Sequence, residues 1–243
     1  MLVCLARAAI LAAALLGWAG VAAAGDLADF NTAVEAAAVH NRVALGYLRT
    51  GNGDLAAVEL ERLRAAWAKV SARFAGKRPD AFDGNPQYVV AFTDIAARLV
   101  TADMMLNSGR GDQARAALNA IREDLYTLRK SAGIVVLADC VRDANAAMDA
   151  LMVYDDRALD WSKSATRFGI ASKAAVYSYA LDRCVGMADE AIRKAPECRR
   201  LIDGAKAGLD LVPKAISTRD TDLLHRILIE LRSFDNLLAF RYG

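Results

Sequence analysis

Three segments of the chain share one pattern, and each is typical of the turn between two helices. In every copy an Asp is followed by an apolar residue six positions later, by a second apolar residue three positions further on, and then by an Arg. The copies begin at Asp54, Asp112 and Asp222. A short polar connector precedes each Asp, and an apolar stretch ends before each connector. This order predicts three helical hairpins.

The Asp at the start of each copy is a candidate for helix capping. A carboxylate near a helix N-terminus accepts hydrogen bonds from exposed backbone N–H groups, and its charge complements the helix dipole. We therefore predict that Asp54, Asp112 and Asp222 cap the second helix of their hairpins. The repeated Arg borders the apolar stripe, so we expect it to brace a neighbouring helix end or carboxylate rather than to catalyse.

Apolar spacing predicts an all-α fold of about eight helices, and no segment has the period of a strand. The expected helices are 27–50, 53–75, 86–107, 111–131, 134–155, 171–194, 197–217 and 221–240. Pro196 separates the sixth from the seventh, and Pro213 is expected to kink the seventh. Four helices with short connectors fold into an antiparallel bundle. We therefore expect two packed four-helix units, residues 25–132 and 133–243, with one continuous domain as the alternative.

The first two hairpins resemble tetratricopeptide repeats at a few positions. Residues at spacings that this family uses are Ala44, Tyr47, Gly51 and Ala56, and then Ala102, Gly109 and Ala114. The resemblance implies a peptide-binding scaffold with a groove near Tyr47. The two hairpins are 58 residues apart, whereas the family repeats about every 34 residues, so a regular solenoid is not expected.

Residues 1–24 have the features of a secretory signal peptide. Arg7 supplies a positive start, residues 8–19 are almost entirely apolar, and small residues precede Gly25. The apolar run is shorter than the roughly 20 residues that a membrane-spanning helix needs. We therefore predict a mature chain that begins near Gly25, works in the periplasm or outside the cell, and has no membrane span.

Three cysteines would remain after export, so at most one internal disulfide can form. If the fifth and sixth helices are antiparallel, Cys140 lies about 9 Å below their shared end, Cys184 about 15 Å and Cys198 about 2 Å. The best-matched pair is Cys140 and Cys184. A bridge between Cys140 and Cys198, or no bridge, are the alternatives.

The charge balance and the motifs exclude several classes of function. The chain has 31 Lys and Arg against 29 Asp and Glu, with no concentrated basic stripe, so we expect no nucleic-acid partner. No Ser/His/Asp set, phosphate-binding Gly loop or His–Glu metal motif occurs. We therefore expect a protein that is not an enzyme and carries no cofactor.

The only histidines are His40 and His225, and they define the alternative function. Helical bundles can hold haem or a metal between facing helices, for electron transfer or metal storage, and these two residues are the candidate ligands. Asp155, Asp156 and Asp160 crowd one connector, where they would hold a hard cation or form a solvated surface with nearby Arg partners.

The sequence as a whole predicts an exported, non-enzymatic helical binding or interaction protein, whose protein or small-molecule partner it does not identify. Apolar residues continue to within one position of Gly243. We expect this C-terminal helix to be buried in the second unit, and a partner-binding tail is the alternative.

Overall fold

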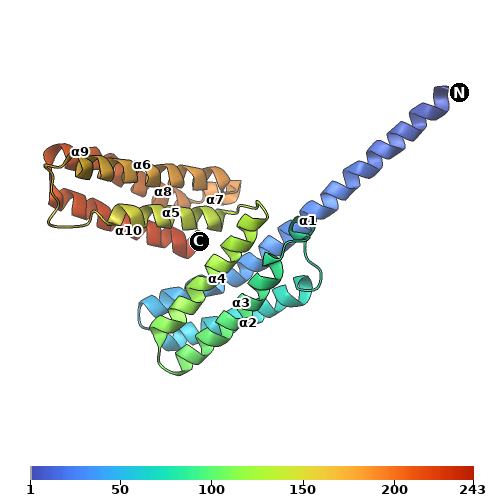
Figure 1. Cartoon of the computed structure of the whole chain (residues 1–243), viewed down its shortest axis with the longest axis horizontal. Helices are drawn as coiled ribbons and strands as arrows, with labels where there is room; N and C mark the ends of the chain where they lie inside the picture. The colour runs from blue at the N-terminus through green and yellow to red at the C-terminus, as the bar shows by residue number, and fades with distance from the viewer. Residues whose placement is uncertain (1) are drawn as a thin grey trace. The chain divides into compact units, whose positions relative to one another are not determined.

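The protein is helical and divides into two compact units (Figure 1). The structure, a computed structural model, describes the backbone of residues 2–243 and the side chains of residues 26–243. Within that backbone there are helices and no strand, which confirms the all-α prediction. The units are Met1–Ile134 and Val135–Gly243. The predicted signal peptide, residues 1–24, lies outside the described side chains.

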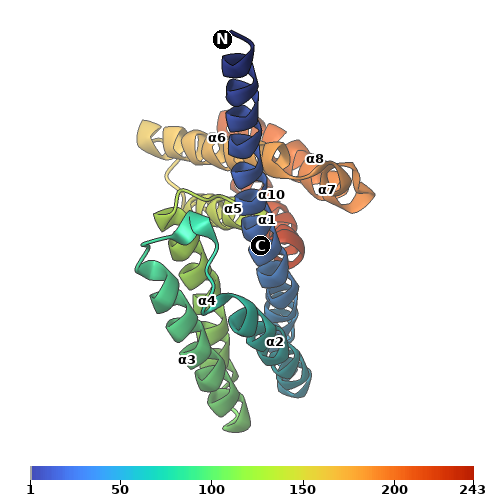
Figure 2. The ribbon, with the colours of Figure 1, turned by 90° about the vertical axis from the view of Figure 1, so that its right-hand side faces the viewer.

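The first unit consists of two helical hairpins. Its elements are α1 (Leu2–Arg49), α2 (Gly53–Phe74), the 3-10 helix η1 (Asp80–Phe82), α3 (Gln87–Asn107) and α4 (Gly111–Ser131). Helix α1 packs along α2, and α3 along α4, as Figure 2 shows. The hairpins meet where α1 contacts α4 and α2 contacts α3.

Aromatic side chains fill one end of the first unit. The Phe30 ring lies edge-on to Phe74 and Phe82, with ring centres 5.4 and 5.3 Å apart. The Tyr88 hydroxyl donates a 2.9 Å hydrogen bond to the Phe74 carbonyl. Burial raises the pKa of Tyr88 to about 12. This cluster ties α1, α2 and α3 together at the end where η1 closes the bundle.

The second unit has four long helices and two short ones. Its elements are α5 (Leu137–Met152), α6 (Ser164–Met187), α7 (Glu190–Lys194), α8 (Pro196–Asp210), α9 (Val212–Thr218) and α10 (Thr221–Tyr242). Helix α5 packs against α6, and α10 contacts both α5 and α8. Leu238 is buried and Tyr242 packs against the core, so the C-terminal helix belongs to this bundle.

The three predicted hairpin turns have the same backbone conformation. The residue three positions before each repeated Asp is left-handed: Gly51 and Gly109 have φ of 77° and 69°, and Arg219 has φ of 55°. In each turn the backbone N–H of the residue after the left-handed one donates a hydrogen bond to the carbonyl oxygen five residues earlier. The N–O distances are 2.9, 2.8 and 3.0 Å in the first, second and third turn. This bond is the mark of a Schellman C-cap, which ends a helix by satisfying its last carbonyl groups.

The capping prediction for Asp54, Asp112 and Asp222 is wrong. Helices α2, α4 and α10 begin one residue earlier, so each Asp is already the second helical residue. A capping side chain must come from the extended residue just outside the helix. That residue is Asp220 in α10, whose carboxylate accepts a 2.8 Å hydrogen bond from the Leu223 N–H. The three predicted residues place a negative charge in the first turn, and Asp112 and Asp222 also accept hydrogen bonds from Arg115 and Arg157.

Several expected helix boundaries are also wrong. Helix α6 begins at Ser164 rather than at 171 and runs through Gly169, where the absence of a side chain leaves room for the Tyr154 hydroxyl. It ends at Met187 rather than at 194, since the Asp189 carboxylate accepts from the Ile192 N–H and starts α7. Near Pro213 the expected seventh helix separates into α8 and α9 instead of kinking.

The shared turn conformation predicts unequal effects of substitution at its left-handed residue. Gly109→Ala should lower the free energy of unfolding by about 1–2 kcal/mol, because a Cβ disfavours this conformation. No heavy atom lies within 4 Å of the added carbon, so the cost is that of the backbone alone. Arg219→Gly should cost nothing. Urea unfolding measures both, and equal losses would show that the turn conformation is unimportant.

Candidate functional site

Helix α6 has two apolar faces, of which the second unit buries one. Ile170, Tyr177 and Leu181 face the core and are fully buried. On the opposite side Phe168 is 77%, Val176 50% and Tyr179 66% exposed. Large apolar side chains concentrated on one exposed face indicate an interaction site. This outer face of α6 is the candidate functional site.

A disulfide fastens the inner face of α6. Cys140 near the start of α5 is bonded to Cys184 near the end of α6, with Cα atoms 5.4 Å apart. The pairing requires α5 and α6 to be antiparallel, because the connector joins their other ends. This is the pair that the positions of the three cysteines along their helix axes favour. Cys198 is a buried free thiol.

A buried polar cluster lies under the middle of α6. Asp235 of α10 is 1% exposed and accepts hydrogen bonds from Asn145 at 2.9 Å and from Arg232 at 3.1 Å. Arg232 also donates to Asp149 at 2.6 Å, which links α10 to α5. Burial raises the pKa of the Tyr177 hydroxyl above its usual range, and the charge of Asp235 raises it further. The hydrogen bonds of this cluster join α10 to α5, and Tyr177 of α6 lies beside them.

Arg232 is the repeated Arg of the third hairpin, and its contacts agree with the bracing role expected from sequence. In the first hairpin the equivalent Arg64 lies 3.8 Å from Asp103 of α3. Both side chains therefore connect their own helix to a carboxylate on a neighbouring one.

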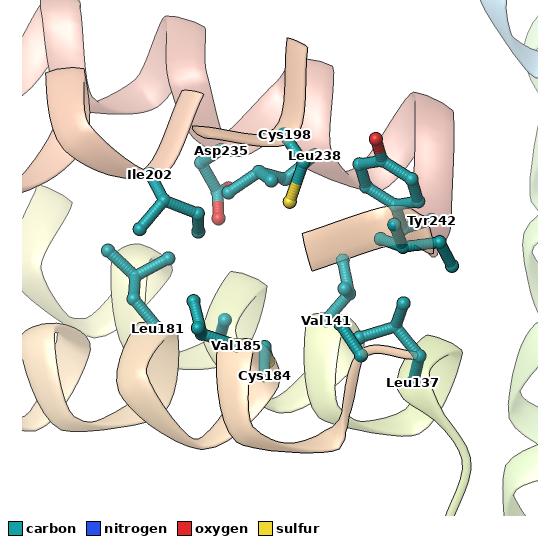
Figure 3. A pocket seen from close by; sticks show the side chains of 13 residues that line it. Leu137, Val141, Leu181, Cys184, Val185, Cys198, Ile202, Asp235, Leu238 and Tyr242 are labelled. Atoms are coloured by element: carbon teal, nitrogen blue, oxygen red, sulfur yellow. The ribbon is translucent and has the colours of Figure 1, made fainter. Parts of the chain in front are cut away.

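A small apolar cavity lies beside the disulfide (Figure 3). Its volume of about 20 Å³ is room for one water molecule. The lining includes Cys184, Cys198, Asp235 and Tyr242, and Figure 3 shows the Cys198 sulfur pointing into the space. Burial raises the pKa of the Cys198 thiol, so the thiol stays protonated and unreactive at neutral pH.

The structure places both candidate metal ligands beside carboxylates. His40 Nδ1 lies 2.8 Å from the Glu59 carboxylate, and His225 Nδ1 lies 2.5 Å from that of Asp155. His40 belongs to the first unit and His225 to the second. Among the described side chains, no three His, Cys, Asp or Glu residues gather as metal ligands.

The acidic connector between α5 and α6 is held by local contacts. Asp156 accepts from the Ala158 N–H at 2.9 Å, and Asp160 accepts from the Ser162 N–H at 3.1 Å. The Ser162 hydroxyl bonded to Asp160 lowers the pKa of this carboxyl. These contacts, together with that between Asp155 and His225, define a structured connector with partnered carboxylates.

Comparison with known proteins adds no relative. No protein-family model, curated protein or solved structure matches the chain. Within the described residues, no helix combines the length and apolar character needed to cross a bilayer.

Sequence reasoning missed the outer face of α6, although its signal is present. Phe168, Ser172, Ala175 and Tyr179 are spaced by four, three and four residues, as on one side of a helix. The residues of the inner face repeat with the same spacing. Because both sides of α6 carry apolar residues, its two sides differ little in hydropathy. That difference usually distinguishes the buried side of a helix from the exposed side.

The buried cluster predicts very unequal effects of removing the two carboxylates that contact Arg232. Asp235→Ala should lower the stability of the second unit by about 1–3 kcal/mol, because the half-buried donors Asn145 and Arg232 lose their buried acceptor. Asp149→Ala, its control, removes an exposed partner of the same Arg and should cost less than about 1 kcal/mol. The fluorescence of Trp161 reports unfolding of the second unit, and that of Trp67 reports the first. Similar losses in the two variants would contradict the role of Asp235.

Proposed function

We propose that the protein is an exported, non-enzymatic interaction module that binds a protein partner through the outer face of α6. The observation that carries this proposal is the exposed stripe of Phe168, Val176 and Tyr179 on a helix whose other face is fully packed. Exposing these side chains to water is unfavourable, and covering them with a partner would recover that free energy.

The disulfide between Cys140 and Cys184 supports export, because such a bond would persist in an oxidising compartment and is unusual in a reducing one.

The buried polar groups support a structural rather than a catalytic role. Asp235 is hydrogen-bonded to Asn145 and Arg232, and the Cys198 thiol is kept protonated by burial. These residues stabilise the bundle that presents α6. Binding would depend on shape and apolar contact at its outer face.

Site-specific photo-cross-linking of the exported protein tests this proposal. A benzoylphenylalanine at position 168 or 179 replaces an exposed aromatic residue with one of similar shape, and should give a discrete adduct identifiable by mass spectrometry. The matched control carries the same group at Glu230, an exposed position on α10 of the same unit. Identical product patterns at 168, 179 and 230 would contradict a binding role for α6.

A further inference from the structure

We propose that the apolar cavity beside the disulfide is a binding site for a small apolar molecule, and that helix α7 is the lid that admits it. The cavity lies inside the second unit, on the inner side of α6. This inference therefore goes beyond the proposed function and does not depend on it. Ile192 of α7 closes the cavity, and the ligand takes the place of its side chain.

The lining of the cavity selects an apolar ligand. Each of the four long helices of the unit contributes an aliphatic side chain: Val141, Val185, Ile202 and Leu238 (Figure 3). Asp235 also lines the cavity, but its carboxylate already accepts hydrogen bonds from Asn145 and Arg232. Small-molecule sites are mostly apolar hollows, and an apolar cavity of this kind excludes water. The space therefore favours hydrocarbon over polar molecules.

Helix α7 is held to the rest of the unit by few contacts. Ile192 is its only residue that is not exposed, and this side chain packs on the core and lines the cavity. Among the helices, α7 packs chiefly against α8, the next one in the chain. In the described part of the chain, the hydrogen bonds and ion pairs of α7 all stay within residues 189–195. Ile192 is therefore the main anchor of the lid.

Both ends of α7 have residues that can act as hinges. Figure 1 shows α7 at the end of the second unit, between α6 and α8. Ala188 and Ala195 flank it with extended backbone, at ψ of 137° and 128°. Pro196 follows Ala195, and a residue before proline is disfavoured in helical conformation, so α7 and α8 remain separate helices. Rotation at the two alanines turns α7 away while α6 and α8 stay packed.

The size of the ligand follows from the space that the lid vacates. The closed cavity of about 20 Å³ has room for one water-sized group. Movement of Ile192 adds the volume of its branched alkyl side chain. The open site then holds about five or six carbon atoms, which corresponds to the end of an alkyl chain or to a single ring. A group of this size gives a dissociation constant on the order of 1–10 mM.

Labelling of the Cys198 thiol tests whether the lid opens without unfolding. In a Cys4→Ala chain this thiol is the only one, because Cys140 and Cys184 are bonded to each other. Burial raises its pKa in the closed state, so methyl methanethiosulfonate reacts when the thiol reaches solvent. Opening of a short helix exposes little surface, so the labelling rate should change less than about twofold up to about 1 M urea. A rate that rises with urea as steeply as unfolding of the second unit overturns the lid.

Truncation of Ile192 tests its role as the anchor. Ile192→Ala should raise the labelling rate about tenfold, because the lid loses its apolar contact with the core. Ile216→Ala is the matched control, since Ile216 is half-buried against the same core on the short helix α9 and does not line the cavity. Equal acceleration in the two variants would show that labelling reports the stability of the whole unit, which overturns the role of α7.

Benzene at about 10 mM is the probe for the binding site. In NMR spectra its protons should show nuclear Overhauser contacts to the methyl groups of Val141, Val185 and Leu238, which line the cavity. Val212, which is buried in the same core but does not line the cavity, is the control. Benzene should also slow labelling of Cys198 about threefold, because the sulfur points into the occupied space.

The outcomes separate this inference from the proposed function. Contacts of benzene with the lining methyl groups but not with Val212, together with labelling that is insensitive to urea, support the lidded site. Absence of those contacts, or equal contacts at Val212, overturns it. Photo-cross-linking at positions 168 and 179 reports on the opposite face of α6, so either proposal can fail while the other stands.

Discussion

The attachment of α6 by its inner face is the constraint on which the second unit depends. A helix with two apolar faces can bury only one of them in its own core. The disulfide from Cys184 to Cys140 and the packing of Tyr177 above Asp235 decide which face that is. The opposite face, with Phe168 and Tyr179, is consequently left in water. The proposed function follows from this division of one helix between core and surface.

Several charged residues in both units connect neighbouring helices. In the first unit Arg98 of α3 is paired with Asp124 of α4, and Glu59 of α2 contacts His40 of α1. In the second unit Asp235 and Arg232 link α10 to α5. An ion pair between two helices constrains their register, and a buried carboxylate is costly unless such partners satisfy it. These ion pairs thus stabilise the two bundles.

Much of the fold was predictable because its signals are local. The three hairpins follow from repeated spacing, and the cysteine pair follows from helix rise and the order of the helices. The capping residue was misassigned because the sequence does not show at which residue a helix begins. In the third hairpin the capping residue is Asp220, which lies just before the first residue of α10. The start of α6 was missed because Gly169 lies within its first turns, and an isolated Gly weakens the helical pattern without ending the helix. The outer face of α6 was missed for a different reason: spacing reveals apolar faces but does not reveal which of two the core will cover.

Hydrogen exchange along α6, measured with and without its disulfide, tests the central claim most directly. The account predicts slow exchange of the buried α6 amides in the oxidised protein, and exchange at least about 30-fold faster in a Cys140→Ala, Cys184→Ala variant, as expected for a loss of 2 kcal/mol or more. Helices α2 to α4 of the first unit should be unchanged. Exchange in α6 that is equally slow in both proteins would contradict the claim that this attachment decides which face of the helix is presented.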